Sequence, residues 1–81
     1  MSDYLSVLKP ARSSWEEEVE YVTKGYFRDK ERAQTIVNTW YTWGYAAGLK
    51  GKFPLYEMLF AYCLGYQDGL ADRELCTDIT Q

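Results

Sequence analysis

The side chains that carry most enzymatic chemistry are scarce in this sequence of 81 residues. It contains no histidine, so the usual general base near neutral pH and the common Ser-His and Cys-His nucleophile pairs are missing. Its two cysteines, Cys63 and Cys76, cannot supply the four Cys or His ligands of a typical zinc site. We therefore expect a protein that is not an enzyme and that uses no cofactor and no metal.

Two other patterns offer weaker candidates for chemistry. Asp68 and Asp72 lie four residues apart and would share one face of a helix, where carboxylates can hold a hard cation, but this spacing is ordinary on helix surfaces. The segment 48–52 contains two glycines and two lysines but lacks the spacing and the Ser or Thr of a phosphate-binding loop. Neither pattern predicts a catalytic or metal-binding site.

Charge and hydropathy exclude further classes of function. Nine basic and twelve acidic side chains give a net charge of -3, and the basic residues are scattered singly, unlike those of nucleic-acid-binding proteins. The longest apolar stretch, 55–64, is shorter than the roughly 20 residues that span a bilayer. Anionic lipid would repel the glutamates at 16–20. We expect a cytoplasmic protein with reduced thiols, no direct contact with nucleic acid and none with a membrane.

The chain's periodicity is helical, and no segment alternates as a strand does. Ser13 and Ser14 each precede a glutamate by three residues, which is the capping-box pattern of a helix start. Asp29 can cap a second helix, and Gly51 and Pro54 mark the change to a third. The sequence therefore predicts one all-α domain over 1–81, a small three-helix bundle with helices near 15–26, 30–49 and 54–74.

The same patterns predict how these elements are arranged. Residues 30–74 should form an antiparallel helical hairpin that turns near Gly51 and packs against the first helix. Residues 1–12 should form a short N-terminal helical arm, and residues 76–81 should be a frayed tail because they lack periodicity. The glutamates at 16, 17, 18 and 20 should form a solvated first helical turn, favoured by the helix dipole.

One motif occurs twice, 21 residues apart. The segments 41–49 and 62–70 agree at five of nine positions and share the pattern Gly-Tyr-x-x-Gly-Leu. Gly44 with Gly48, and Gly65 with Gly69, would each form a shallow notch on one helix face. Each glycine inside a helix costs roughly 0.5–1 kcal/mol relative to alanine. Something that occupies the notches should offset this cost.

Three interpretations of these notches stay open. They can receive large aromatic side chains from neighbouring helices as internal packing. At least one can lie at a self-association interface, most simply in a two-fold dimer. Together with Tyr66 they can also line a pocket in which a planar ligand, such as a nucleotide base, stacks. In an antiparallel hairpin the two notches would not face each other, so one of them would be directed outward.

Aromatic residues make up 17% of the chain, which is more than three short helices usually bury. Trp15, Tyr21, Trp43 and Tyr45 fall partly outside the inward-facing stripes and are candidate contacts with a partner. Our first hypothesis is a non-enzymatic binding protein that inhibits or modulates a protein partner, as small accessory proteins of phages and mobile elements do. The alternatives are an oligomeric binder that sequesters a nucleotide-like molecule and a purely structural homo-oligomer.

Overall fold

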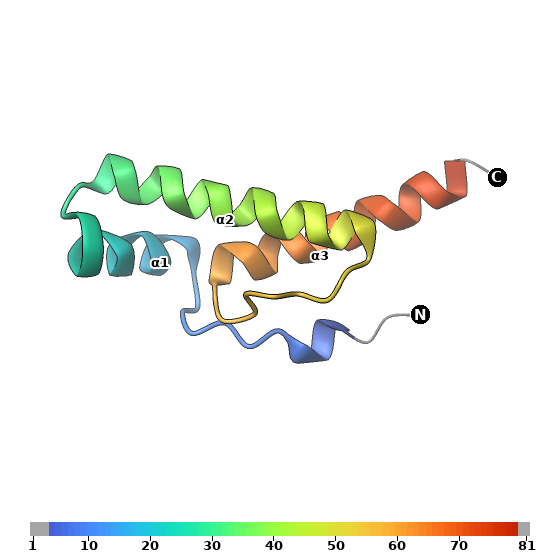
Figure 1. The fold of residues 1–81 in the computed structure, drawn as a ribbon, viewed down its shortest axis with the longest axis horizontal. Coiled ribbons are helices and arrows are strands. Elements are labelled where there is room, and N and C mark those ends of the chain that lie inside the picture. The colour runs from blue at the N-terminus through green and yellow to red at the C-terminus, as the bar shows by residue number, and fades with distance from the viewer. Residues whose placement is uncertain (1–3, 80–81) are drawn as a thin grey trace.

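The computed structural model describes residues 4–79, which form helices and connecting segments and contain no strand. The three α-helices are α1 (Trp15–Val22), α2 (Lys30–Lys50) and α3 (Phe60–Ile79) (Figure 1). A 3₁₀ helix, Tyr4–Val7, precedes them, and a π-helical turn, Thr23–Phe27, follows α1 directly. The prediction of a small all-α bundle is confirmed. Residues 1–3 of the expected arm and 80–81 of the expected tail lie outside the described residues.

The predicted caps define where α1 and α2 begin and where α2 ends. The Ser14 hydroxyl accepts a hydrogen bond from the Glu17 amide at 3.1 Å, and the Glu17 carboxylate accepts from the Ser13 amide at 2.8 Å. The Asp29 carboxylate accepts from the Glu31 amide at 3.0 Å at the start of α2. Gly51 ends α2 in the left-handed conformation, at φ 69°, where a side chain would be strained.

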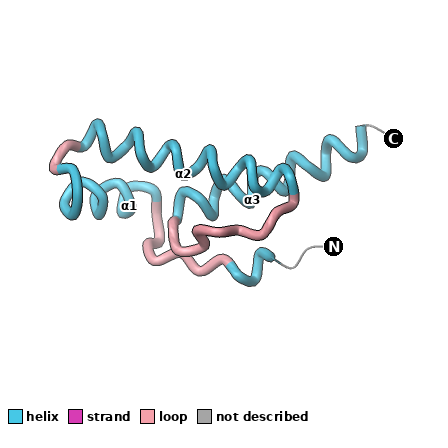
Figure 2. Tube along the Cα trace, viewed as in Figure 1, coloured by secondary structure: helices cyan, strands magenta, loops and turns pink. Residues whose placement is uncertain are grey.

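The prediction of an antiparallel hairpin is wrong, because α2 and α3 are parallel. Gly44 lies against Tyr62 and Gly48 against Tyr66, so residue numbers increase in the same direction along both helices. The segment that connects the end of α2 to the start of α3 must therefore run back along the length of the helix contact. Residues 52–59, here called the crossover segment, make that return in an extended and turning path (Figure 2).

This return also corrects the boundaries expected for the third helix. Pro54 was expected at its first turn, but it is buried within the crossover segment, and α3 begins at Phe60. At its other end, α3 continues to Ile79 instead of fraying from residue 76. Figure 1 shows this last part of α3 projecting beyond the end of α2.

The core lies where α1 and the start of α3 both pack on α2. Val19 and Val22 of α1, Ala33 and Val37 of α2, and Ala61 of α3 form one buried cluster. Larger side chains close its edges: Trp15, Ile36, Trp40 and Tyr41. The molecule is elongated, with extents of 48 × 22 × 16 Å. None of the helices within residues 4–79 combines the length and apolar character that crossing a membrane requires.

Candidate functional site

The two copies of the repeated motif pack directly against each other. A Cβ atom added to Gly44 would lie 2.0 Å from the Tyr62 carbonyl oxygen, and one added to Gly65 would lie 2.1 Å from the Tyr41 carbonyl oxygen. These two contacts are equivalent under the 21-residue repeat. The absence of a Cβ lets the backbones approach closely, as small residues do where helices pack tightly. Each copy of the motif is thus the packing partner of the other.

Gly48 and Gly69 complete this interface. They lie against the carbonyl oxygens of Tyr66 and Tyr45, so both notches face inward and are filled within one chain. The expectation that one notch is directed outward is therefore wrong, because it followed from the antiparallel arrangement. What fills the notches is helix backbone and not an aromatic ring. A second subunit or a planar ligand could enter them only if α2 and α3 separated.

Tyrosines beside the glycines have different partners in the two copies. Tyr41 and Tyr45 of α2 stack at 6.5 Å, and their hydroxyls donate to the carboxylates of Asp68 and Asp72 on α3. The bond to Asp68 raises the pKa of Tyr41 to about 12, because the carboxylate stabilises the protonated phenol. Asp68 and Asp72 therefore serve as hydrogen-bond acceptors. Among the side chains that the structure describes, no group of three or more His, Cys, Asp or Glu could hold a metal ion.

The second pair of tyrosines holds the crossover segment. Tyr62 and Tyr66 of α3 also stack at 6.5 Å, and both are buried. The Tyr62 hydroxyl accepts a hydrogen bond from the Leu55 amide at 3.2 Å, and the Tyr66 hydroxyl donates to the Lys52 carbonyl at 2.6 Å. Tyr66, a predicted member of a ligand notch, is thus a buried structural residue in this fold.

Glu18 is the most deeply buried charged residue described. We expected it on a solvated helical turn, but its carboxylate accepts hydrogen bonds from the first two amides of α3, Phe60 at 2.8 Å and Ala61 at 2.7 Å. The Arg12 guanidinium donates to it from the other side at 3.1 Å. An acidic group at a helix N-terminus is favoured by the helix dipole. A side chain from α1 therefore caps α3.

Cys63 is also buried, and its environment keeps the thiol protonated. Its Sγ donates to the Glu57 carbonyl oxygen at 2.9 Å. Burial, followed by the nearby charge of Glu18, raises the pKa of this thiol to about 11. Since the thiolate is the reactive form, Cys63 is poorly suited to act as a nucleophile.

The four predicted partner contacts differ in how far they are exposed. Tyr21 and Trp43 are about half exposed, at 46% and 48%, whereas Trp15 packs on the core and Tyr45 is bonded to Asp72. The Trp43 ring lies 6.0 Å from that of Tyr56 in the crossover segment. Tyr21 lies with Met58 and Leu59 of the same segment. Trp15 and Tyr45 both contact the ring of Tyr41.

Tyr21 lies in a groove of about 710 Å³, here called the aromatic groove. The groove is bordered by α1 and the π-helical turn that follows it, by α2, by the crossover segment and by residues 11–12. Several large apolar side chains on its edge are exposed, most of all Tyr26 at 68% and Met58 at 46%, with Phe27 beside them. The described lining residues are Ala11, Arg12, Tyr21, Val22, Tyr26, Phe27, Ile36, Trp40, Met58 and Leu59. The groove therefore gathers exposed aromatic surface around a concavity.

The three- and four-residue spacing of Val19, Val22 and Tyr26 places Tyr26 on the inward stripe of a regular first helix, and the structure overturns that prediction. The π-helical turn at Thr23–Phe27 inserts a wider turn, which shifts the angular position of the residues that follow. Tyr26 consequently points outward and meets Tyr21 edge to face, with ring centres 5.9 Å apart. A hydrogen bond to Tyr21 raises the pKa of Tyr26.

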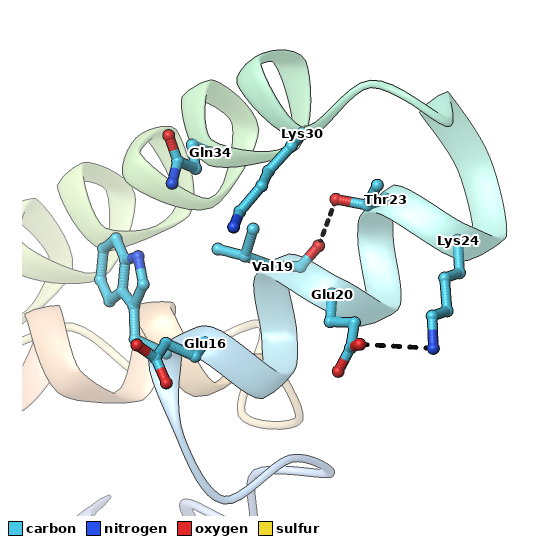
Figure 3. A pocket seen from close by; sticks show the side chains of 8 residues that line it. Glu16, Val19, Glu20, Thr23, Lys24, Lys30 and Gln34 are labelled. Atoms are coloured by element: carbon cyan, nitrogen blue, oxygen red, sulfur yellow. Dashed lines mark hydrogen bonds and ion pairs between the residues drawn. The ribbon is translucent and has the colours of Figure 1, made fainter.

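A second pocket, of about 550 Å³, lies between α1 and the start of α2 (Figure 3). Lys30 and Gln34 approach it from α2, and Glu16 and Glu20 from α1. Glu20 forms an ion pair with Lys24 at 3.3 Å, and both side chains are largely exposed. Long exposed side chains are costly to immobilise, so this pocket is the weaker candidate.

Comparisons with protein-family models, curated proteins and solved structures find no match to this chain.

Proposed function

We propose that this protein is a small non-enzymatic binding protein that engages a protein partner through the aromatic groove and thereby modulates or inhibits that partner. The observation that carries the proposal is the exposure of Tyr26, Phe27 and Met58 around a concave apolar surface. Exposed apolar groups clustered in this way are characteristic of interaction sites. The cytoplasmic location expected from the sequence remains part of the proposal.

The residue types in the groove support this proposal. Tyrosine, tryptophan, methionine and arginine are enriched at protein interfaces, and the groove contains all four, in Tyr21, Trp40, Met58 and Arg12. Aromatic anchors lose little conformational entropy on binding, because they have only two rotatable side-chain bonds. Their rings also lie against each other before any partner arrives, as the contact of Tyr21 with Tyr26 illustrates.

The test compares capture by three forms of the protein from an extract of its own cells. The groove variant is Tyr26→Ala with Met58→Ala. The control variant, Leu55→Ala with Leu75→Ala, removes side chains of similar exposure that are absent from the described groove lining. Quantitative mass spectrometry of the captured proteins is the readout, and native mass spectrometry of each purified form shows whether it is itself a dimer.

We expect the wild type and the control variant to capture one other protein from the extract. The groove variant should recover at least about fivefold less of that protein, since truncating an interface anchor typically costs more than 1 kcal/mol. Equal recovery with all three forms would refute a role for the groove. Capture of nothing except further copies of this chain would instead identify a homo-oligomer.

A further inference from the structure

The polar groups of the aromatic groove lie together, and none that the structure describes is acidic. Arg12 is the charged side chain in the described lining, and Tyr21 and Tyr26 contribute hydroxyls. The Arg12 guanidinium carbon lies 4.1 Å from the centre of the Tyr21 ring, and Tyr26 contacts that same ring. Because Tyr26 and Tyr21 share a hydrogen bond, the donors that remain for a ligand are guanidinium N–H groups and one phenol hydroxyl. Such donors suit an acceptor that carries negative charge.

The Arg12 guanidinium already interacts with carboxylates of its own chain. Its Nε donates to Glu18, whose carboxylate also accepts the first two amides of α3. Hydrogen bonds from Ser13 and, to a lesser extent, the charge of Arg12 lower the pKa of the exposed Glu17. What Arg12 offers a ligand is therefore its remaining N–H donors and not an excess of positive charge.

Arg12 is held in place before any partner binds. Its side chain is 13% exposed and lies over the Tyr21 ring, and the neighbouring Ala11 amide donates to the Met58 carbonyl at 2.8 Å. The bond to Glu18 uses the Nε hydrogen, and a guanidinium has four further N–H donors. A donor that is already immobilised loses little entropy when it binds an acceptor.

From this arrangement, and resting on the proposed function, we infer that the groove binds an apolar segment of a protein partner that carries a carboxylate, and that this carboxylate lies against Arg12, Tyr21 and Tyr26. The aromatic rings and Met58 take the apolar side chains, and the donors take the acidic group. The hydrogen bonds to the carboxylate therefore set how the segment lies in the groove.

The test selects ligands without assuming their sequence. A phage-displayed library of random peptides is selected on the wild-type protein, and the enriched peptides are synthesised with amidated C-termini. Each is then made with its Asp or Glu replaced by Asn or Gln, and also with a free C-terminal carboxylate. Fluorescence anisotropy measures the binding of every peptide to the wild type and to the groove variant.

We expect enriched peptides to combine large apolar residues with an acidic residue, and the amide replacement to weaken binding about tenfold, as loss of a hydrogen bond to a charged group does. Restored binding by a free C-terminal carboxylate on an Asn or Gln peptide would show that a terminal carboxylate also serves. This peptide comparison uses the wild-type protein, so it does not depend on whether any variant folds.

A protein variant gives a second, independent measurement. Tyr21→Phe with Tyr26→Phe keeps both rings and leaves the Arg12–Glu18 pair intact, and it should reduce the preference for acidic over amide peptides. Tyr56→Phe is the matched control, because Tyr56 is similarly exposed and is absent from the described groove lining. It should leave that preference unchanged.

The outcomes separate the two proposals. Peptides that need an intact groove but bind equally well with an amide or a lysine in place of the acidic residue would overturn the carboxylate inference and leave the proposed function standing. Peptides that bind the groove variant as tightly as the wild type, or no enrichment at all, would overturn the proposed function itself.

Discussion

Replacing Gly44 with alanine tests the contact on which the parallel arrangement of α2 and α3 depends. The new Cβ would lie 2.0 Å from the Tyr62 carbonyl oxygen, whereas ordinary van der Waals contact begins near 3.4 Å. The obstacle is backbone, which cannot rotate away as a side chain can. The two helices would therefore have to move apart by about 1 Å or more.

The size of the effect follows from what that movement removes. A gap of about 0.5–1 Å already forfeits a quarter to a half of the dispersion energy between the atoms that separate. Overpacking of this kind typically costs about 1–3 kcal/mol and more where backbone must shift, while alanine regains about 0.5–1 kcal/mol of helix propensity. We expect a net loss of about 2 kcal/mol, from a total stability of roughly 4–12 kcal/mol for a chain of this length. The midpoint of thermal unfolding should fall by roughly 8–16 °C.

Circular dichroism during heating and urea unfolding measure this change, and the chain supplies a matched control. A Cβ added to Gly25 would meet nothing within 4 Å, so Gly25→Ala should leave stability unchanged or raise it by up to about 1 kcal/mol. Gly65→Ala should behave like Gly44→Ala, because the repeat makes their contacts equivalent. The double variant of Gly44 and Gly65 should lose less than the sum of the two, since either substitution alone separates the helices.

The reasoning would be refuted if Gly44→Ala melted at or above the wild-type temperature, as Gly25→Ala is expected to. In that case α2 and α3 would not approach closely at their glycines, and the parallel arrangement that this approach requires would be wrong.

Three further measurements test other parts of the structure. Glu18→Gln removes the charged partner of Arg12 and turns a side-chain amide toward the first backbone amides of α3. Urea unfolding should therefore show that the free energy of unfolding falls by about 3 kcal/mol, and a fall under about 0.5 kcal/mol would contradict the cap. Tyr41 keeps its proton in the folded state up to about pH 12 but loses it near pH 10 when unfolded, so stability should fall as the pH rises through this range. Tyr41→Phe should reduce the slope of stability against pH, and an unchanged slope would argue against the bond to Asp68. In a Cys76→Ser background, the folded protein should react with a thiol reagent at least about 100-fold more slowly than the unfolded protein at mildly alkaline pH. The reason is that the pKa of Cys63 is raised from 9.0 to about 11 in the folded state. Equal rates would place this thiol at the surface.

The helix starts were predictable because their causes are local. Ser14 and Asp29 act on amides within three residues of themselves, and Gly51 ends α2 through its own backbone conformation. Interactions this short in sequence leave a readable pattern. The repeated glycines were also recognisable as contact points from their spacing alone.

The candidate groove was only partly predictable. Tyr21 was identified from its position outside the apolar stripe, but Tyr26 was assigned to the inward face because a regular α-helix was assumed. A π-helical turn leaves little trace in the sequence. Met58 joins the groove only because the crossover segment brings it beside α1, and no local pattern indicates that contact.

Residue types and their spacing by themselves determined that the chain is all-α, where α1 and α2 begin, and which residues form close helix contacts. The direction of α3 relative to α2, the burial of Glu18 and the formation of the groove were decided only by the tertiary structure. Glu18 illustrates the physical reason. Its sequence neighbours are those of an exposed glutamate, and its carboxylate becomes a cap only when the amides of Phe60 and Ala61 arrive from more than forty residues away. Such a contact stabilises the fold as a whole, so it cannot be read from the segment that contains either partner.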